Sequence, residues 1–187
     1  MAKKYSSIPE TLEHIKHIRK ALMLICEELK FRGLNHDSSK TKDPEVSYFD
    51  KYTPELKKLT YGSSEYNESL ESLKPALEHH YKNNRHHPEY FDEGIEGMNL
   101  IDVLEMFCDW YAASKRTKDG DIRRSIDVSC DRFNIGLQLK KILKNSIDLI
   151  EKPENHDTSV KNNYLSLCTN CNGDGCFICN YTGATKD

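Results

Sequence analysis

Histidine and carboxylate side chains recur between residues 36 and 109 in a pattern suited to binding metal ions. They occur as His36-Asp37, His79-His80, His86-His87, Asp102, Glu105 and Asp109. Imidazole suits transition metals, and a carboxylate can bridge two of them. Bound divalent metals hold a water, lower its pKa and neutralise phosphoryl oxygens, and the hydrolysis of a phosphate ester needs all three effects. The pattern therefore predicts a metal site for phosphate-ester hydrolysis.

An expected helix leads into the His36-Asp37 pair. Residues 7–32 carry apolar residues at helical spacing, and Gly33 is a typical helix stop. His14 and His17 are three residues apart on this stretch, so they share a face, which borders the apolar stripe. The His-Asp pair is thus expected in the turn that follows the helix.

The two His pairs flank the end of a second helical stretch. Residues 65–84 keep the helical period, and a break or restart is expected at Pro75. His80 falls on the apolar face of this stretch, so it should point inward more than His79 does. Residues 86–89 should then be extended, because the residue before a proline avoids the helical region.

The three later carboxylates lie on a helix that should belong to the core. Residues 100–117 are apolar nearly all round, and Asn99 is expected as the N-cap. Asp102, Glu105 and Asp109 nevertheless form one acidic stripe, because they are spaced at i, i+3 and i+7. Buried carboxylates need a compensating charge. A bound metal ion would supply it.

Helical patterns account for the rest of the chain up to residue 151. Short helices are predicted to begin at Pro44 and again at Pro54, since proline suits the first helical turn. Two more helices are expected at about residues 121–130 and 134–151. Strand patterns and internal repeats are absent from this part of the sequence. The sequence thus predicts an all-α domain over residues 1–152.

The bulk composition limits the classes of function. The chain has 187 residues, of which 37% are hydrophobic and 30% charged, as expected for a globular domain with a small appendage. A net charge of −3 gives no electrostatic case for nucleic-acid binding. No window is apolar enough to span a membrane, and the N-terminus lacks the apolar segment of a signal peptide. A cytoplasmic location is therefore expected.

Cysteine usage agrees with a reducing compartment. Seven cysteines is an odd number, and four of them crowd into residues 168–179. Reduced thiols that bind a metal fit this arrangement better than a disulfide framework does. The other three, Cys26, Cys108 and Cys130, lie on apolar helical stretches and are expected in the core.

The clustered cysteines form the strongest single metal motif in the chain. They are Cys168, Cys171, Cys176 and Cys179. Four thiolates at this spacing close a tetrahedral structural zinc site, although an iron–sulfur cluster or a redox dithiol stays open. The segment from Cys168 to Gly175 resembles the repeat of the DnaJ-type zinc-binding region. We expect a linker at residues 153–163 and a zinc-binding tail at residues 164–187, which would dock to a protein partner.

The order of the histidines and carboxylates resembles the HD-domain metal-dependent phosphohydrolases. The signature of that superfamily is a His, then His-Asp, then Asp, spread over a helical bundle. His17, the His36-Asp37 pair and Asp109 match it here, with His17 standing 19 residues before His36. Some members carry a Lys three residues after the Asp of the pair, and Lys40 stands there. The resemblance implies an HD-like helical bundle.

A closer likeness is to an uncharacterised HD-related family of bacterial and phage proteins. The matching segments are residues 33–40 followed by Glu45, residues 79–90, and the stretch from Glu105 to Asp109. The likeness covers about residues 10–120 and stops short of the cysteine tail. It implies a fold and a metal chemistry in a bacterial or phage-infected cell, and it brings no substrate.

The resemblance implies a role for each matching residue. His17, His36, Asp37 and Asp109 would hold a first divalent metal (Mn, Fe, Co, Mg or Zn). A second would be held by His80 with His86, His87 or both. Lys40 would meet a phosphate oxygen, and Glu105 would orient a ligand His or accept a proton. The choices between His14 and His17, between His79 and His80, and between His86 and His87 stay open.

Three hypotheses of function follow. In the first, the chain hydrolyses a small phosphorylated substrate, a nucleotide or another phosphate ester. In the second, it is a non-catalytic adaptor whose metal site is degenerate and whose zinc tail recruits a partner. The third, a helical di-iron oxygenase, fits less well because the Glu-x-x-His pairs of ferritin-like bundles are missing. Substrate, metal identity and oligomeric state are not determined by the sequence.

Overall fold

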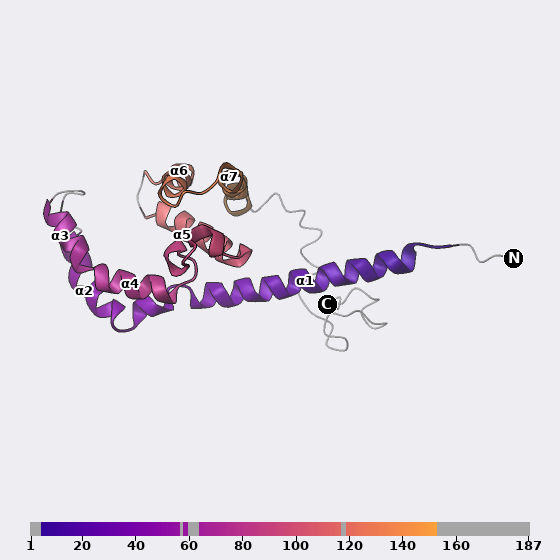
Figure 1. Cartoon of the computed structure of the whole chain (residues 1–187), viewed down its shortest axis with the longest axis horizontal. Helices are drawn as coiled ribbons and strands as arrows, with labels where there is room; N and C mark the ends of the chain where they lie inside the picture. Colours follow the sequence, from indigo (N-terminus) through magenta and orange to yellow (C-terminus); the bar gives the residue numbers. More distant parts are fainter. Residues whose placement is uncertain (1–4, 57, 60–63, 117–118, 153–187) are drawn as a thin grey trace. The chain divides into compact units, whose positions relative to one another are not determined.

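The computed structural model describes residues 5–56, 58–59, 64–116 and 119–152, and no strand occurs among them. The all-α prediction is therefore confirmed for this part of the chain. Its elements are α1 (Ile8–Asn35), η1 (Ser38–Thr41), α2 (Glu45–Leu56), α3 (Ser64–Ser72), α4 (Lys74–Asn83), η2 (Pro88–Tyr90), η3 (Gly94–Gly97), α5 (Leu100–Ser114), α6 (Ile122–Arg132) and α7 (Leu137–Glu151), where η denotes a short 3-10 helix (Figure 1).

The chain divides into two compact units. One consists of residues 29–145, and the other combines residues 1–28 with residues 146–187. The first of these units contains the His pairs and the acidic helix. None of the described helices is both long enough and apolar enough to cross a membrane.

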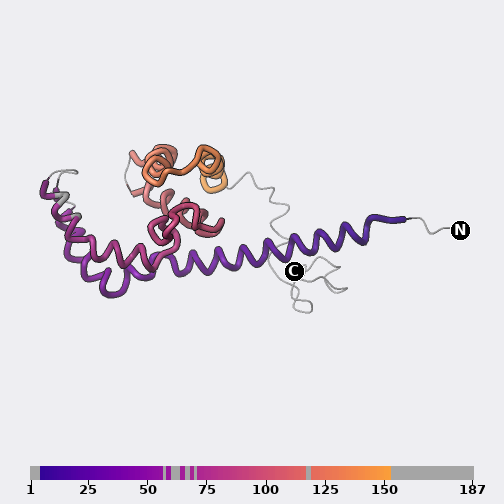
Figure 2. Tube along the Cα trace, viewed as in Figure 1, coloured from indigo at the N-terminus to yellow at the C-terminus, as the bar shows by residue number. Residues whose placement is uncertain are grey.

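Helix α1 is longer than its sequence predicts. Figures 1 and 2 show it as one uninterrupted helix, and it ends at Asn35. The predicted stop at Gly33 is wrong, because Gly33 keeps a helical conformation. Asp37 instead takes the left-handed conformation, with φ 54°, which Asp tolerates better than most residues do. The reversal of the chain therefore occurs at the His36-Asp37 pair itself.

Helix α2 begins at Glu45, directly after Pro44, as predicted. The second start predicted at Pro54 is wrong, because Pro54 lies inside α2. A proline inside a helix removes one N–H hydrogen bond and crowds the preceding turn. Here α2 continues for only two residues beyond Pro54, so few helical hydrogen bonds are at stake.

Helices α3 and α4 are separated at Leu73, and Pro75 stands in the first turn of α4 as predicted. Both helices pack against α2, and α4 also packs against η1 (Figure 1). His80 is 1% exposed, whereas the side chain of His79 is 39% exposed. The predicted inward orientation of His80 is confirmed. His87 is extended, as predicted for the segment after α4, but Pro88 begins the short helix η2.

Helix α5 begins with the predicted N-cap. The Asn99 side chain accepts from the N–H groups of Ile101 and Asp102, and the Asp102 carboxylate accepts from the Asn99 N–H. This reciprocal pair fixes the first turn. The expectation that α5 is core all round is wrong, because Leu100 is 80% exposed.

The apolar core of residues 29–145 comes from short stretches of several helices. Helix α5 packs on α6. The buried residues are Leu73, Ala76, Met106, Phe107, Ile122, Ile126, Cys130, Ile135 and Leu143. Of the three cysteines expected in the core, Cys130 is buried, but Cys26 and Cys108 are exposed, so the expectation is wrong for these two. For Cys26 the reason is that none of the residues of α1 is buried.

Candidate metal centre

Asp37 stands between two groups of side chains that could hold metal ions. One group consists of Asp37, His80, His86 and His87. The other consists of His36, Asp37 and Asp109. Within each group, the nitrogen and oxygen atoms that would bind a metal lie within 4.8 Å of one another. Because Asp37 belongs to both groups, its carboxylate is placed to bridge two ions, as its predicted role requires.

Each carboxylate oxygen of Asp37 faces a different set of partners. Oδ1 lies 3.3 Å from Nε2 of His80 and 3.5 Å from Nε2 of His86. Oδ2 lies 3.6 Å from Nε2 of His36 and 2.6 Å from Nζ of Lys40. The left-handed turn at Asp37 directs this carboxylate between residues of α4, the segment after α4, and its own turn.

Glu105 on α5 orients two of the histidines. Its Oε1 lies 2.9 Å from Nδ1 of His36 and 3.2 Å from Nδ1 of His86. A carboxylate at Nδ1 favours the tautomer that carries its proton there, and Nε2 then keeps its lone pair. Both Nε2 atoms face Asp37. The orienting role of Glu105 stays a prediction.

Glu45 contacts Nδ1 of His80 in the same way that Glu105 contacts Nδ1 of His36 and His86. Glu45 is fully buried, with Oε2 2.9 Å from Nδ1 of His80 and Oε1 2.7 Å from Nδ1 of His79. Sequence reasoning gave Glu45 no role. The likeness to the HD-related family includes Glu45 and could have marked it as functional. Its partners, however, depend on the packing of α2 against α4.

Two buried atoms at the centre have no hydrogen-bond partner. They are Oδ1 of Asp37 and Nε2 of His86, and they face each other across 3.5 Å. A third atom, Oε2 of Glu105, also lacks a hydrogen bond, but it lies 2.5 Å from Nη2 of Arg32 in an ion pair. Buried polar atoms are nearly always satisfied. The lone pairs of Oδ1 of Asp37 and Nε2 of His86 face each other, an arrangement suited to a cation that both atoms bind.

Comparison of the sequence with known protein families gives one match. A family of unknown function, DUF5662, matches residues 3–153. The chain belongs to the DUF5662 family. The match includes every residue around Asp37 named above and ends before the clustered cysteines. No curated protein and no solved structure matches the chain.

The charges at the DUF5662 centre are set by close contacts. Hydrogen bonds to Asp109 and Glu105 raise the pKa of His36 to about 10. Without a metal His36 is therefore protonated on both ring nitrogens, and a metal bound at Nε2 would have to displace the proton there. Burial, together with the nearby His86 and His80, lowers the pKa of His87 to about 3. His87 is therefore neutral at physiological pH, with a lone pair available for a metal.

The carboxylates of the centre are ionised. Burial favours the neutral form of Asp37, but the close contacts with His80 and Lys40 outweigh it and hold the pKa of Asp37 below its usual range. Burial likewise opposes ionisation of Glu105, and hydrogen bonds from His36 and His86 lower its pKa nonetheless. Ionised carboxylates and a neutral imidazole are the forms in which these side chains bind metals.

Two arginines supply the charge that the acidic stripe needs. Asp102 is fully buried and accepts from Nη1 of Arg32 at 3.0 Å, and from Nε and Nη2 of Arg85 at 3.0 and 2.8 Å. Arg32 also pairs with Glu105. The sequence suggested that a metal would compensate the whole stripe. For Asp102, arginines do so instead: Arg32 ties the end of α1 to α5, and Arg85 ties the segment after α4 to it.

The remaining predicted residues fall in three places. His17 lies in the other unit, where its side chain is 72% exposed and its Nε2 is 3.4 Å from Glu13; it belongs to neither Asp37 group. Lys40 pairs with Asp37, and its contact with a phosphate oxygen stays a prediction. The four clustered cysteines, Cys168, Cys171, Cys176 and Cys179, lie outside the described residues.

Replacing Glu105 by Gln should weaken metal binding by about 10- to 100-fold, the usual effect of losing a group that orients ligand histidines. The amide cannot accept from both Nδ1–H groups with a full negative charge. Metal titration of the full chain by calorimetry measures the effect. Glu96→Gln, at an exposed position in η3, is the matched control and should leave the affinity unchanged. Equal affinities for the two variants would exclude the orienting role.

Proposed function

We propose that this chain is a metal-dependent hydrolase of phosphate esters, with its centre at Asp37. The observation that carries the proposal is the pair of unpartnered buried atoms, Oδ1 of Asp37 and Nε2 of His86. Two acceptors that face each other at 3.5 Å repel unless a cation lies between them. The three histidines His80, His86 and His87 and the carboxylate of Asp37 form a donor set suited to divalent transition metals.

The ligand residues would divide into two sets around Asp37. His80, His86 and His87 would hold one ion with Oδ1 of Asp37, and His36 and Asp109 would hold the other with Oδ2. A divalent metal at such a site lowers the pKa of a water and neutralises charge on phosphoryl oxygens. Both effects are needed for hydrolysis of a phosphate ester, and the order of the ligands resembles HD-type phosphohydrolases.

The surrounding residues would position these ligands and the substrate. Glu45 and Glu105 would hold the Nδ1 protons of three histidines, so that the Nε2 lone pairs face the centre. Lys40 is about one-third exposed beside Asp37, where its ammonium group can meet a phosphoryl oxygen. A structural zinc ion in the cysteine tail, and a protein partner bound through that tail, are further parts of the proposal.

Metal content and turnover test the proposal together. The full chain is purified, its metals are counted by elemental analysis, and nucleotides, phosphate monoesters and phosphodiesters are screened with Mn, Fe, Co, Mg and Zn. His80→Ala should lower the metal content and abolish turnover. Lys82→Ala is the matched control, because Lys82 is exposed on the same helix and belongs to no candidate ligand group. His17→Ala decides whether His17 contributes.

The outcomes separate the proposal from its alternative. Turnover that requires a metal and is lost in His80→Ala supports hydrolysis. A metal content that is the same in wild type and His80→Ala, with no turnover under any metal, would sink the proposal. That second outcome would favour the adaptor hypothesis, in which the metal site is degenerate.

A further inference from the structure

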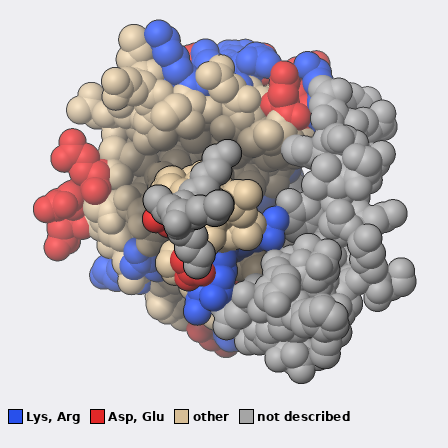
Figure 3. All heavy atoms as spheres, turned by 90° about the vertical axis from the view of Figure 1, so that its right-hand side faces the viewer, with Lys and Arg blue, Asp and Glu red and all other residues tan. Residues whose placement is uncertain are grey.

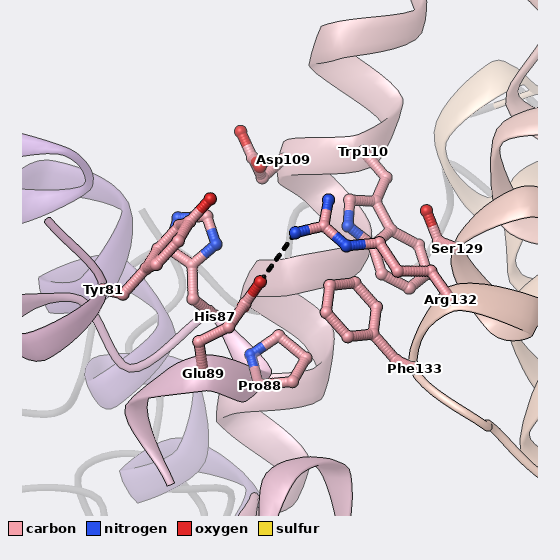
Figure 4. A pocket seen from close by; sticks show the side chains of 9 residues that line it. All are labelled: Tyr81, His87, Pro88, Glu89, Asp109, Trp110, Ser129, Arg132 and Phe133. Atoms are coloured by element: carbon pink, nitrogen blue, oxygen red, sulfur yellow. Dashed lines mark hydrogen bonds and ion pairs between the residues drawn. The ribbon is translucent and has the colours of Figure 1, made fainter. Parts of the chain in front are cut away.

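A cavity of about 230 Å³ lies directly beside the candidate metal ligands. His87 and Asp109, one from each group around Asp37, form part of its wall. Figure 4 shows Asp109 and Trp110 on α5 and Arg132 on α6 lining the same space as the segment that carries His87. A small ligand in this cavity would therefore touch residues of the proposed metal centre.

Arg132 is the cationic side chain of this cavity. Among the nine residues that line it, no other is Lys or Arg. The guanidinium group lies 4.7 Å from the centre of the Phe133 ring, and its Nη2 lies 2.8 Å from Oε1 of Glu89. Contact with an aromatic face and a carboxylate holds the planar guanidinium in a fixed orientation. Among the described residues, the hydrogen bond and ion pair of Arg132 go to Glu89.

The ion pair between Arg132 and Glu89 is exchangeable. The Arg132 side chain is 62% exposed and that of Glu89 is 28% exposed. Ion pairs with this degree of solvent contact contribute little to stability. A phosphoryl group offers the guanidinium the same two-oxygen geometry as a carboxylate, with more negative charge. Glu89 can thus act as an internal counterion that a phosphoryl group displaces.

The rest of the cavity suits a small organic phosphate. Trp110 and Phe133 stack in parallel at 6.3 Å between ring centres, and they form an aromatic wall. Tyr81 and Ser129 add hydroxyl groups. The cavity is smaller than the roughly 300–1,000 Å³ typical of pockets for drug-sized ligands, so the ligand must be small. The face shown in Figure 3 carries acidic and basic side chains interspersed.

We propose that Arg132 binds the phosphoryl group of a small phosphate monoester in this cavity, with the carbon portion against Trp110 and Phe133. The inference rests on the proposed hydrolase function, and it adds a substrate class and a binding residue to it. A monoester is favoured over a diester because its phosphoryl group has three non-bridging oxygens. It can offer two of them to Arg132 and still present the third toward a metal ion that Asp109 and His87 would help to hold.

Trp110 provides a direct probe of the cavity, because it is the only tryptophan in the chain. The full chain is titrated with inorganic phosphate and with phenyl phosphate while its intrinsic fluorescence is recorded. An anion beside the indole alters its emission, so wild type should give a saturable change. Arg132→Gln should raise the apparent dissociation constant at least about tenfold, as expected for the loss of a charge-assisted contact.

Three further variants sharpen the measurement. Arg132→Lys keeps the positive charge but loses the two parallel N–H donors of the guanidinium. Its dissociation constant for phosphate should lie between those of wild type and Arg132→Gln. Glu89→Gln removes the internal counterion and should bind phosphate more tightly, by about two- to tenfold. Arg123→Gln, at an exposed position on the same helix, is the matched control and should bind as wild type does. Circular dichroism verifies that each variant is folded.

The inference is overturned if wild type gives no saturable change, if folded Arg132→Gln binds phosphate as wild type does, or if acetate binds as tightly as phosphate. His36→Ala separates this result from the proposed hydrolase function, since His36 does not line the cavity. A phosphate response retained in that variant supports a cavity that binds independently of the metal. If phosphate binding depends on Arg132 but the chain hydrolyses no substrate with any metal, the proposed hydrolase function is refuted, whereas the proposed phosphate-binding site is supported.

Discussion

Asp37→Asn should reduce phosphate-ester hydrolysis by at least about 1,000-fold, a rise of roughly 4 kcal/mol in the activation barrier. The substitution removes the negative charge on which both ligand groups converge. It should leave the backbone unchanged, because Asn adopts the left-handed conformation at φ 54° as readily as Asp does. The measurements are kcat/KM with the best substrate of the screen and metal content by elemental analysis.

Asp37→Gly is the companion variant. Glycine adopts the left-handed conformation without steric cost, so the turn after α1 should form at least as easily. Both variants should lose metal and turnover, although the glycine variant lacks the whole side chain. Folded Asp37→Asn protein that turns over within tenfold of wild type would exclude a bridging role for this carboxylate.

The residues that gather at the centre could largely be predicted from the sequence. His36, Asp37 and Asp109 stand out because a His-Asp dipeptide and a charged stripe on an apolar helix are unusual patterns. The inward orientation of His80 followed from its spacing with the apolar residues of α4, and the structure confirms it. Local periodicity is enough where a side chain's direction depends only on its own helix.

The partners that hold those residues could not be predicted in the same way. Glu45 meets His80 only because α2 packs against α4. Arg32 lies inside the predicted helix, but it meets Asp102 and Glu105 only because the last turns of α1 lie against α5. Contacts between helices depend on tertiary packing, which periodicity does not specify.

Asp102→Ala should destabilise the fold by about 3–5 kcal/mol, the usual cost of removing one partner from a buried ion pair. Asp102 is fully buried and accepts from Arg32, from Arg85 and from the Asn99 N–H. Without it, Arg85 loses its carboxylate and the first turn of α5 loses half of its capping box. Urea unfolding of the full chain at neutral pH gives the difference in free energy.

The matched control for this loss is Asp127→Asn. Asp127 pairs with Lys140 and Lys144, but its side chain is 43% exposed. Solvent screens such pairs, so the effect on unfolding should be small. Equal losses in Asp102→Ala and Asp127→Asn would show that the arginine contacts of Asp102 contribute no more than a surface pair does.

Acidification should remove the contribution of Asp102 in a defined direction. Burial opposes its ionisation, but hydrogen bonds from Arg85, the Asn99 N–H and Arg32 outweigh this and hold the pKa of Asp102 below its usual range. A lowered folded-state pKa means that the stabilisation is complete above the unfolded value, about 3.9, and is lost as pH falls through the folded-state pKa. The free-energy difference between wild type and Asp102→Asn should therefore be constant from neutral pH down to about pH 5 and shrink on further acidification. A difference that stays constant from pH 7 to pH 2.5 would mean that Asp102 is not stabilised as the ionised form, and that the arginines of α1 and of the segment after α4 are held to α5 by other contacts.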